Sequence, residues 1–134
     1  MLNAFVGVSQ SRADALRAAN LPVPPPTHVI ALVDTGASGT CVDPLVLKGL
    51  GLTPTGSIPV LTPSTGATPH TADQYDVSIL IPSSQIQIPL SIPALPVMCS
   101  ELAAQGIQAL IGRDILRNCM LFYNGEIGLF SLSY

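Results

Sequence analysis

Hydrophobic and polar residues alternate over several short stretches of this chain, with the period of two that is typical of half-buried β-strands. The clearest alternation covers residues 76–81, where Val77, Ile79 and Ile81 share one face, and a second covers residues 85–92. The same pattern predicts further strands over residues 2–9, 56–61, 70–75, 120–123 and 126–133. The chain is therefore expected to be mainly β.

Two other stretches consist almost entirely of aliphatic residues, which favours strands buried on both faces. Residues 28–33 run into Asp34, and residues 107–111 run into Gly112. In each copy we expect the strand to be followed by a turn and a short helix. The two stretches therefore form an internal pseudo-repeat, in which only the first copy has a carboxylate at the end of its strand.

Capping residues predict where short helices begin. Ser11 is a suitable N-cap for a helix over residues 11–20, and Asp43 followed by Pro44 indicates the start of a second helix. The second helix is expected to pack against the sheet through Leu45, Val46 and Leu50.

Turn-forming residues divide the rest of the chain. Residues 10–27 form an insert that ends in a Pro-rich connector, and residues 58–75 are expected to be a projecting hairpin. Asn124-Gly125 predicts a two-residue type I′ turn between the last two strands. Three further connections are expected: a short link at residues 82–84, a loop or edge strand at 93–100 and one helical turn at 101–105.

Composition restricts the classes of protein to which this chain can belong. Its 134 residues fit one domain, residues 1–134, and its net charge of -3 with five Lys and Arg gives no basic surface for a nucleic acid. Its apolar runs are shorter than the roughly 20 residues that cross a bilayer, and residues 1–10 do not resemble a signal peptide. We therefore expect a cytoplasmic protein with no membrane partner. Only 10% of the residues are charged, which favours an apolar surface covered by another chain.

The cysteines and histidines do not form a recognisable site. Cys41, Cys99 and Cys119 are odd in number and lack a Cys-x-x-Cys spacing, so buried reduced thiols are expected rather than disulfides. His28 and His70 lie in unrelated contexts, which leaves no set of metal ligands or catalytic thiol partner. Neither a metal nor a cofactor is expected.

The candidate chemistry lies in the loop that begins at Asp34. Gly36 allows a tight turn, and the hydroxyls of Thr35 and Ser38 can hold a carboxylate and the loop around it. An Asp-Thr-Gly triplet by itself is usually only a turn. The preceding aliphatic strand and the following Ala37-Ser38 favour a catalytic carboxylate.

This loop, the projecting hairpin and the later Leu-Ile-Gly-Arg-Asp segment occur in the order found in retropepsin-like aspartic proteases, and residues 29–132 resemble that family. The resemblance implies an all-β fold, a closed acid-protease β-barrel with one or two short helices, which is active as a homodimer. It implies that Asp34 is the catalytic carboxylate, that Thr35 braces the two loops across the two-fold axis, and that the backbone of Gly36 runs beside the substrate. Ala37 and Ser38 would complete the active-site loop.

The resemblance also assigns roles outside that loop. The apolar support beneath the loop would be the second copy of the repeat, Leu110, Ile111, Gly112 and Arg113. The flap tip that closes over a peptide would be Ser64, Thr65, Gly66, Ala67 and Thr68. Segments 2–9 and 128–134 would contribute to the dimer. Because Ser38-Gly39 replaces the acids common in viral relatives, Arg113 is left with Asp43, Asp114 or solvent as its partner.

Three functions are compatible with these residues. The first is a homodimeric aspartic endopeptidase, in which two copies of Asp34 share a proton and cleave a peptide or protein substrate. The second is a catalytically silent dimerisation or peptide-binding module on the same fold. A two-carboxylate glycosidase is the weakest, because no second acid lies at a matching strand end and few aromatic residues can stack on sugar. The sequence favours the endopeptidase.

Overall fold

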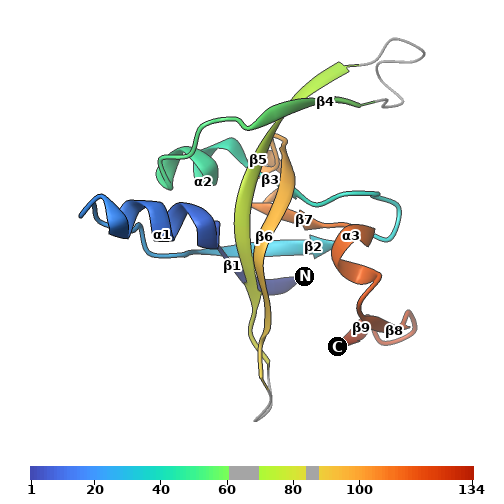
Figure 1. Cartoon of the computed structure of the whole chain (residues 1–134). Helices are drawn as coiled ribbons and strands as arrows, with labels where there is room; N and C mark the ends of the chain where they lie inside the picture. The colour runs from blue at the N-terminus through green and yellow to red at the C-terminus, as the bar shows by residue number, and fades with distance from the viewer. Residues whose placement is uncertain (61–69, 84–87) are drawn as a thin grey trace.

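The computed structural model describes residues 1–60, 70–83 and 88–134, in which six strands close into a barrel (Figure 1). Around the barrel these strands are β1 (Leu2–Val8), β2 (Thr27–Val33), β7 (Ala109–Ile111), β3 (Cys41–Val42), β6 (Leu90–Cys99) and β5 (His70–Ile81). The antiparallel pairing of β1 with β5 closes the ring, and β4 (Gly56–Val60) extends it beyond β5. The prediction of a mainly β, closed barrel is confirmed.

Alternate residues of the barrel strands fill its interior. Val6, Val29, Val77, Val97 and Ile111 are all buried, and the other core residues are mostly small or branched aliphatic side chains. Such residues suit short, closely paired strands, because a β-branched side chain packs well on a pleated surface. The core is therefore continuous beneath the end of β2, where Asp34 lies.

Within the described residues three α-helices and one 3-10 turn lie outside the barrel, where the resemblance implied one or two short helices. The helices are α1 (Gln10–Ala18), α2 (Pro44–Gly49) and α3 (Arg113–Leu116), and the 3-10 helix is η1 (Ala103–Gln105). The N-cap of α1 is Ser9, two residues earlier than predicted, because the Ser9 hydroxyl accepts from the Arg12 backbone N–H. No helix in the described ranges is long and apolar enough to cross a membrane.

Helix α2 begins as predicted, with Asp43 as its N-cap and Pro44 at its first position. Val46 and Leu50 are buried against the barrel, also as predicted. Leu45 is 71% exposed, so its expected packing contact is wrong. Val46 and Leu50 are four residues apart and therefore share the face of α2 that lies toward the barrel, whereas Leu45 lies on another face.

The strands around residues 70–99 differ most from the expectation. The expected strands 70–75 and 76–81 are one continuous strand, β5. Because β6 starts at Leu90, the predicted strand over 85–92 is confirmed at residues 90–92 and wrong at residues 88 and 89, and the rest of it lies outside the described residues. Ile88 lies outside β6 and is 86% exposed. Residues 93–99 are a strand and not a loop, because β6 pairs with β5. On the other side of β6 only Met98 and Cys99 pair with β3, so within the described residues most of this stretch is an edge, one of the two predicted alternatives.

The last two strands, β8 (Met120–Asn124) and β9 (Leu129–Ser133), form a separate hairpin. Asn124 pairs with Leu129, so the connection is the four residues 125–128 and not a two-residue turn. Gly128 has a φ of 67°, whereas Gly125 does not adopt the positive φ that a type I′ turn needs. The hairpin was predicted correctly, but its turn type was wrong.

Candidate active site

The two copies of the pseudo-repeat lie side by side in the structure. Strands β2 and β7 pair in parallel, with Ala31 opposite Ala109, Leu32 opposite Leu110 and Val33 opposite Ile111. The pairing continues one residue further, because the Asp34 backbone N–H donates to the Ile111 carbonyl oxygen at 2.9 Å. The loop after β2 and helix α3 consequently lie at the same side of the barrel (Figure 1).

Asp34 is half-buried at the start of an exposed turn. Its Oδ1 atom accepts a hydrogen bond from the Gly36 backbone N–H at 2.8 Å, and its carbonyl oxygen accepts from the Ala37 N–H at 3.3 Å. A Cβ atom on Gly36 would lie 3.1 Å from Oδ1, which is a tight contact. The turn therefore fixes the orientation of the carboxylate and leaves Thr35, Gly36 and Ser38 open to a ligand.

The start of α3 packs directly on the far half of this loop. A Cβ atom on Gly112 would lie 2.5 Å from both the carbonyl carbon and the oxygen of Gly39, so only glycine fits there. The Arg113 backbone N–H donates to the Ala37 carbonyl oxygen at 2.9 Å. The predicted support of the loop by the second copy thus takes the form of backbone contact at Gly112 and Arg113, with Ile111 buried beneath.

A buried threonine joins the two copies. The Thr40 hydroxyl donates to Asp114 Oδ1 at 2.7 Å and accepts from the Gly112 N–H at 3.2 Å, while the Thr40 N–H donates to Asp114 Oδ2 at 3.0 Å. Thr40 was not identified from the sequence, and Asp114 was considered only as a partner for Arg113. The sequence signal that could have indicated this contact was Asp114 itself. It is an acid in the first turn of a helix without a side-chain N-cap, where backbone N–H groups have no partner within the helix.

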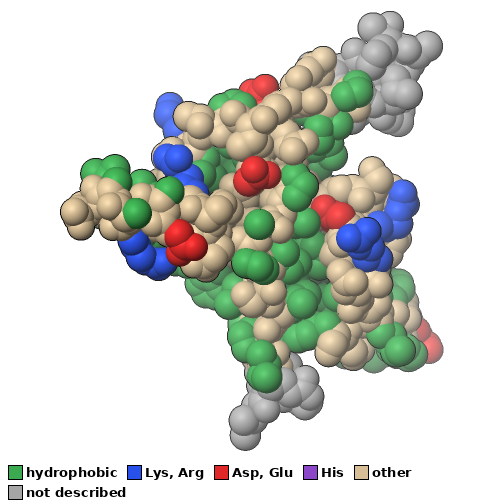
Figure 2. Space-filling model, viewed as in Figure 1, with side chains coloured by type: hydrophobic (Ala, Val, Ile, Leu, Met, Phe, Trp, Pro, Cys, Tyr) green, Lys and Arg blue, Asp and Glu red, His purple; other side chains and the backbone are tan. Residues whose placement is uncertain are grey.

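Arg113 is paired with neither of the two carboxylates considered for it, Asp43 and Asp114. Its Nη1 atom donates to the carbonyl oxygens of Thr35 at 3.1 Å and Gly36 at 3.4 Å, although the residue is exposed. Asp43 and Asp114 accept hydrogen bonds from other groups instead. Figure 2 shows basic side chains over α3 and over the end formed by α1 and α2, with apolar, uncharged and acidic side chains on the surface between them.

Asp43 has a structural role away from the candidate site. Burial by itself would raise the pKa of its carboxyl, but backbone N–H donors from Leu102, Leu45 and Ala103 outweigh burial and lower that pKa below its ordinary value. The three donors lie 2.9 Å from the carboxylate oxygens. Asp43 therefore remains charged while it caps α2 and anchors the segment that leads into η1.

The three cysteines are free but only half-buried, so the expectation of buried thiols is wrong in degree. Burial raises the pKa of Cys41, and the carboxylates of Asp114 and Asp34 raise it further. Burial is also the main cause of the raised pKa of Cys99 and of Cys119. A raised pKa disfavours the thiolate that a cysteine nucleophile requires. Among the described residues no group of three or more His, Cys, Asp or Glu is placed to hold a metal ion.

The predicted flap tip, residues 64–68, lies outside the described residues. The base of the hairpin is described, and Gly56, Ser57 and Ile58 of β4 pair with β5. The hairpin thus begins two residues before the expected residue 58 and its second strand continues to Ile81. A scan against protein-family models and a search of curated proteins each returned no match to this chain.

Proposed function

We propose that this protein is an aspartic endopeptidase of the retropepsin-like type, active as a homodimer in which each chain supplies one Asp34. The observation that carries the proposal is the placement of Asp34, a half-buried carboxylate held by the Gly36 N–H on a loop otherwise open to solvent. A carboxylate that served only as a turn former would not need the buried support from α3. That support has the form required to preorganise a reacting group.

The need for a second chain comes from the chemistry. Hydrolysis of a peptide by carboxylates needs one group to take a proton from water and another to donate a proton to the carbonyl oxygen. Near the Asp34 loop, Asp114 accepts hydrogen bonds from Thr40 and Ile115, and Asp43 is committed to three backbone donors. A two-fold axis beside Asp34 would supply the missing carboxylate from a second copy.

In the proposed reaction the two Asp34 carboxyls share one proton, as the paired carboxyls of aspartic proteases in general do, because two like charges about 3 Å apart cannot both ionise. The charged carboxylate removes a proton from a water molecule whose oxygen attacks the peptide carbonyl carbon. The protonated carboxyl gives its proton to the carbonyl oxygen. Collapse of the tetrahedral intermediate breaks the C–N bond, and a proton passes to the leaving amine.

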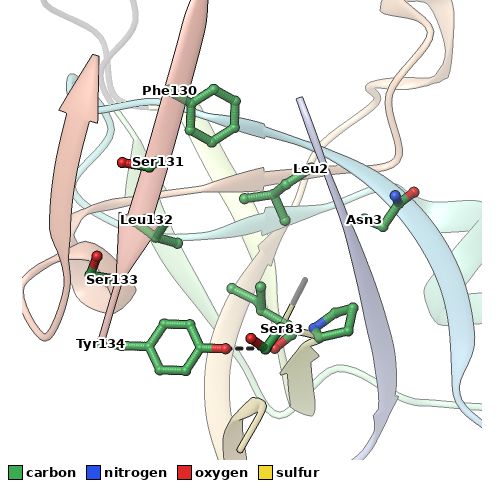
Figure 3. A pocket seen from close by; sticks show the side chains of 10 residues that line it. Leu2, Asn3, Ser83, Phe130, Ser131, Leu132, Ser133 and Tyr134 are labelled. Atoms are coloured by element: carbon green, nitrogen blue, oxygen red, sulfur yellow. Dashed lines mark hydrogen bonds between the residues drawn. The ribbon is translucent and has the colours of Figure 1, made fainter. Parts of the chain in front are cut away.

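The C-terminal hairpin is the surface on which we place the second copy. Its outward face carries Met120, Phe122 and Leu129, each exposed, and Phe122 is 67% exposed. Its other face borders a cleft of about 670 Å³ that also involves β1 and the end of β5. Figure 3 shows Phe130 and Leu132 facing Leu2 across this cleft, while Ser131 and Ser133 point away. In the described residues β9 pairs only with β8, so one edge is open for strand pairing.

The outer faces of β2 and β7 indicate the substrate class. Leu32 and Leu110 are neighbours in register, and neither is buried, although the residues on either side of them are largely enclosed. They give the floor beside Asp34 an apolar surface without charged side chains. An extended peptide with apolar residues around the cleaved bond would suit it, with main-chain hydrogen bonds adding affinity.

The test is cleavage of a mixed peptide library by the wild type and by Asp34→Asn, from acidic to neutral pH and over a range of protein concentrations. We expect the variant to keep its fold and lose at least about a thousandfold in kcat/KM, because its dimer carries two neutral amides and no carboxyl to hold the shared proton. Asp76→Asn, which removes an exposed carboxylate on β5, is the matched control and should retain activity. Wild-type activity should be highest in acid and fall more than proportionally on dilution.

Retained turnover in Asp34→Asn would exclude the proposed mechanism. A folded wild type that cleaves nothing at any pH or concentration would favour a peptide-binding module instead. Sedimentation of the same samples separates a failure of catalysis from a failure of dimerisation. An inert dimer points to the module, and an inert monomer points to a dimer too weak for the assay.

A further inference from the structure

The peptide unit that joins Thr35 to Gly36 is held at both of its ends. Its N–H, which belongs to Gly36, donates to Asp34 Oδ1 at 2.8 Å. Its carbonyl, which belongs to Thr35, accepts from Arg113 Nη1 at 3.1 Å. One peptide plane therefore links a guanidinium on one side to the candidate catalytic carboxylate on the other.

We propose that Arg113 is a positioning residue for Asp34, and that it acts through the Thr35–Gly36 peptide unit. This inference rests on the proposed function and adds a specific way in which the second copy of the repeat controls the first. The hydrogen bond from a cation to the Thr35 oxygen fixes the rotation of the peptide plane. It also polarises the peptide, which strengthens the hydrogen bond from the Gly36 N–H to Oδ1.

The position of Arg113 is set independently of its side chain. Its backbone N–H is bonded to the Ala37 carbonyl, and Gly112 before it lies against the backbone of Gly39. The start of α3 therefore remains beside the loop when the side chain changes. The same Nη1 atom also lies 3.4 Å from the Gly36 carbonyl oxygen, so two successive peptide planes of the turn contact one guanidinium nitrogen.

No nearby carboxylate draws the guanidinium away from these carbonyls. Asp114, the next residue, has both oxygens bonded to Thr40, and Asp43 has both oxygens bonded to backbone N–H groups. Among the described residues the ion pair found is Arg17 with Asp14, far from this helix in the sequence. Arg113 therefore contributes its charge to the loop and not to a surface salt bridge.

Loss of this contact would change the geometry of the catalytic pair. Without Arg113 the Thr35–Gly36 plane is free to rotate, and the Gly36 N–H is no longer directed at Oδ1. Substrate binding on the floor should change little, because within the described residues the hydrogen bonds of the Arg113 side chain go to the loop backbone.

The test compares Arg113→Met, Arg113→Lys and Arg117→Met in the full chain. Met keeps the apolar stem and removes every donor, Lys keeps a charge and donors, and Arg117 is an exposed cation one turn later on the same surface. We expect Arg113→Met to lower kcat about 10- to 100-fold with KM nearly unchanged. Arg113→Lys should recover part of the lost kcat, and Arg117→Met should behave as wild type.

A second readout does not depend on catalysis. The backbone amide resonance of Gly36 in an NMR spectrum reports its hydrogen bond to Asp34 and should move upfield in Arg113→Met but not in Arg117→Met. Thermal unfolding at matched concentration identifies any variant that fails to fold. If the wild type proves inert, the proposed function fails while the Gly36 resonance still tests the contact.

Three results would overturn the inference. The first is an Arg113→Met enzyme with unchanged kcat. The second is an equal loss in Arg117→Met, which would reflect only the charge of α3. The third is a Gly36 resonance that does not respond to Arg113→Met, because the peptide unit would then be held without the guanidinium.

Discussion

The two copies of the strand-turn-helix repeat differ in the segment that connects the strand to the helix. After β7, one residue, Gly112, leads directly into α3, whereas after β2 the chain makes a long excursion through the Asp34 loop and β3 before α2 begins at Pro44. The strands themselves pair in parallel and in register. The two strands are therefore arranged alike, but β2 is followed by a long exposed loop and β7 by a tight turn.

This difference shows how the two copies divide their roles. The first copy presents an exposed loop with a carboxylate, which cannot be stable by its own packing. The second copy is short and buried where it meets that loop, and it supplies contacts at Gly112, Arg113 and Asp114. The candidate chemistry thus lies in one copy, and its rigidity comes from the other. Substitutions at the contacts between the copies test that division.

Gly112→Ala should have the largest effect on stability. The new methyl group would have to lie 2.5 Å from the backbone of Gly39, and backbone cannot move aside as a flexible side chain can. We expect a loss of about 3 kcal/mol or more in the free energy of unfolding, with displacement of the Asp34 loop. Chemical denaturation at fixed protein concentration measures it.

Gly49→Ala is the matched control for that prediction. Gly49 ends α2, and a Cβ atom there would meet no atom within 4 Å. This substitution should leave stability unchanged or raise it by up to about 1 kcal/mol, because alanine loses less backbone entropy on folding. If Gly112→Ala were as stable as Gly49→Ala, the two copies would not be in the close contact described.

Local signals in the sequence predicted the first copy better than the second. The strand before Asp34 and the Asp43-Pro44 helix start depend on neighbouring residues, and both are confirmed. The partners of Arg113 and Thr40 lie more than 70 positions away in the chain, as the separations of 78 and 74 residues show. No local pattern distinguishes a guanidinium bonded to carbonyls from a solvated one. Strand β6 was misplaced for the same reason, because pairing on both sides decides its ends.

Asp43→Asn should have the next largest effect, and that effect should depend on pH. The amide that replaces one carboxylate oxygen cannot accept from the backbone N–H groups that face it, which costs about 2 to 3 kcal/mol at neutral pH. The pKa of Asp43 is lowered in the folded state from its ordinary 3.8, so its charge stabilises the fold above that value. This stabilisation decreases as the pH falls below 3.8 and is lost once the pH passes the lowered folded pKa.

The difference in stability between wild type and Asp43→Asn should therefore be full near neutral pH and become smaller in acid. Denaturation at a series of pH values measures it, and Asp73→Asn on the exposed surface of β5 serves as the control. A difference that stays constant down to the lowest pH would mean that the three backbone donors do not depend on the charge of Asp43.

Thr40→Val should have the smallest effect of the three and the most specific one, because Thr40 is the side chain that joins the two copies. Valine keeps the shape of threonine but removes the hydroxyl that donates to Asp114 and accepts from the Gly112 N–H. Asp114 keeps its bonds from the Thr40 and Ile115 backbone N–H groups, so the main cost is the unpaired Gly112 N–H in a buried site. We expect a loss of about 1 to 2 kcal/mol, while Thr40→Ser, which keeps the hydroxyl, should lose less.

A double-mutant cycle with Asp114→Asn should give a coupling energy above about 0.5 kcal/mol, because the two side chains are in direct contact. Additive effects in that cycle would mean that the Thr40–Asp114 hydrogen bond does not hold the copies together, which would leave that role to the contacts at Gly112 and Arg113.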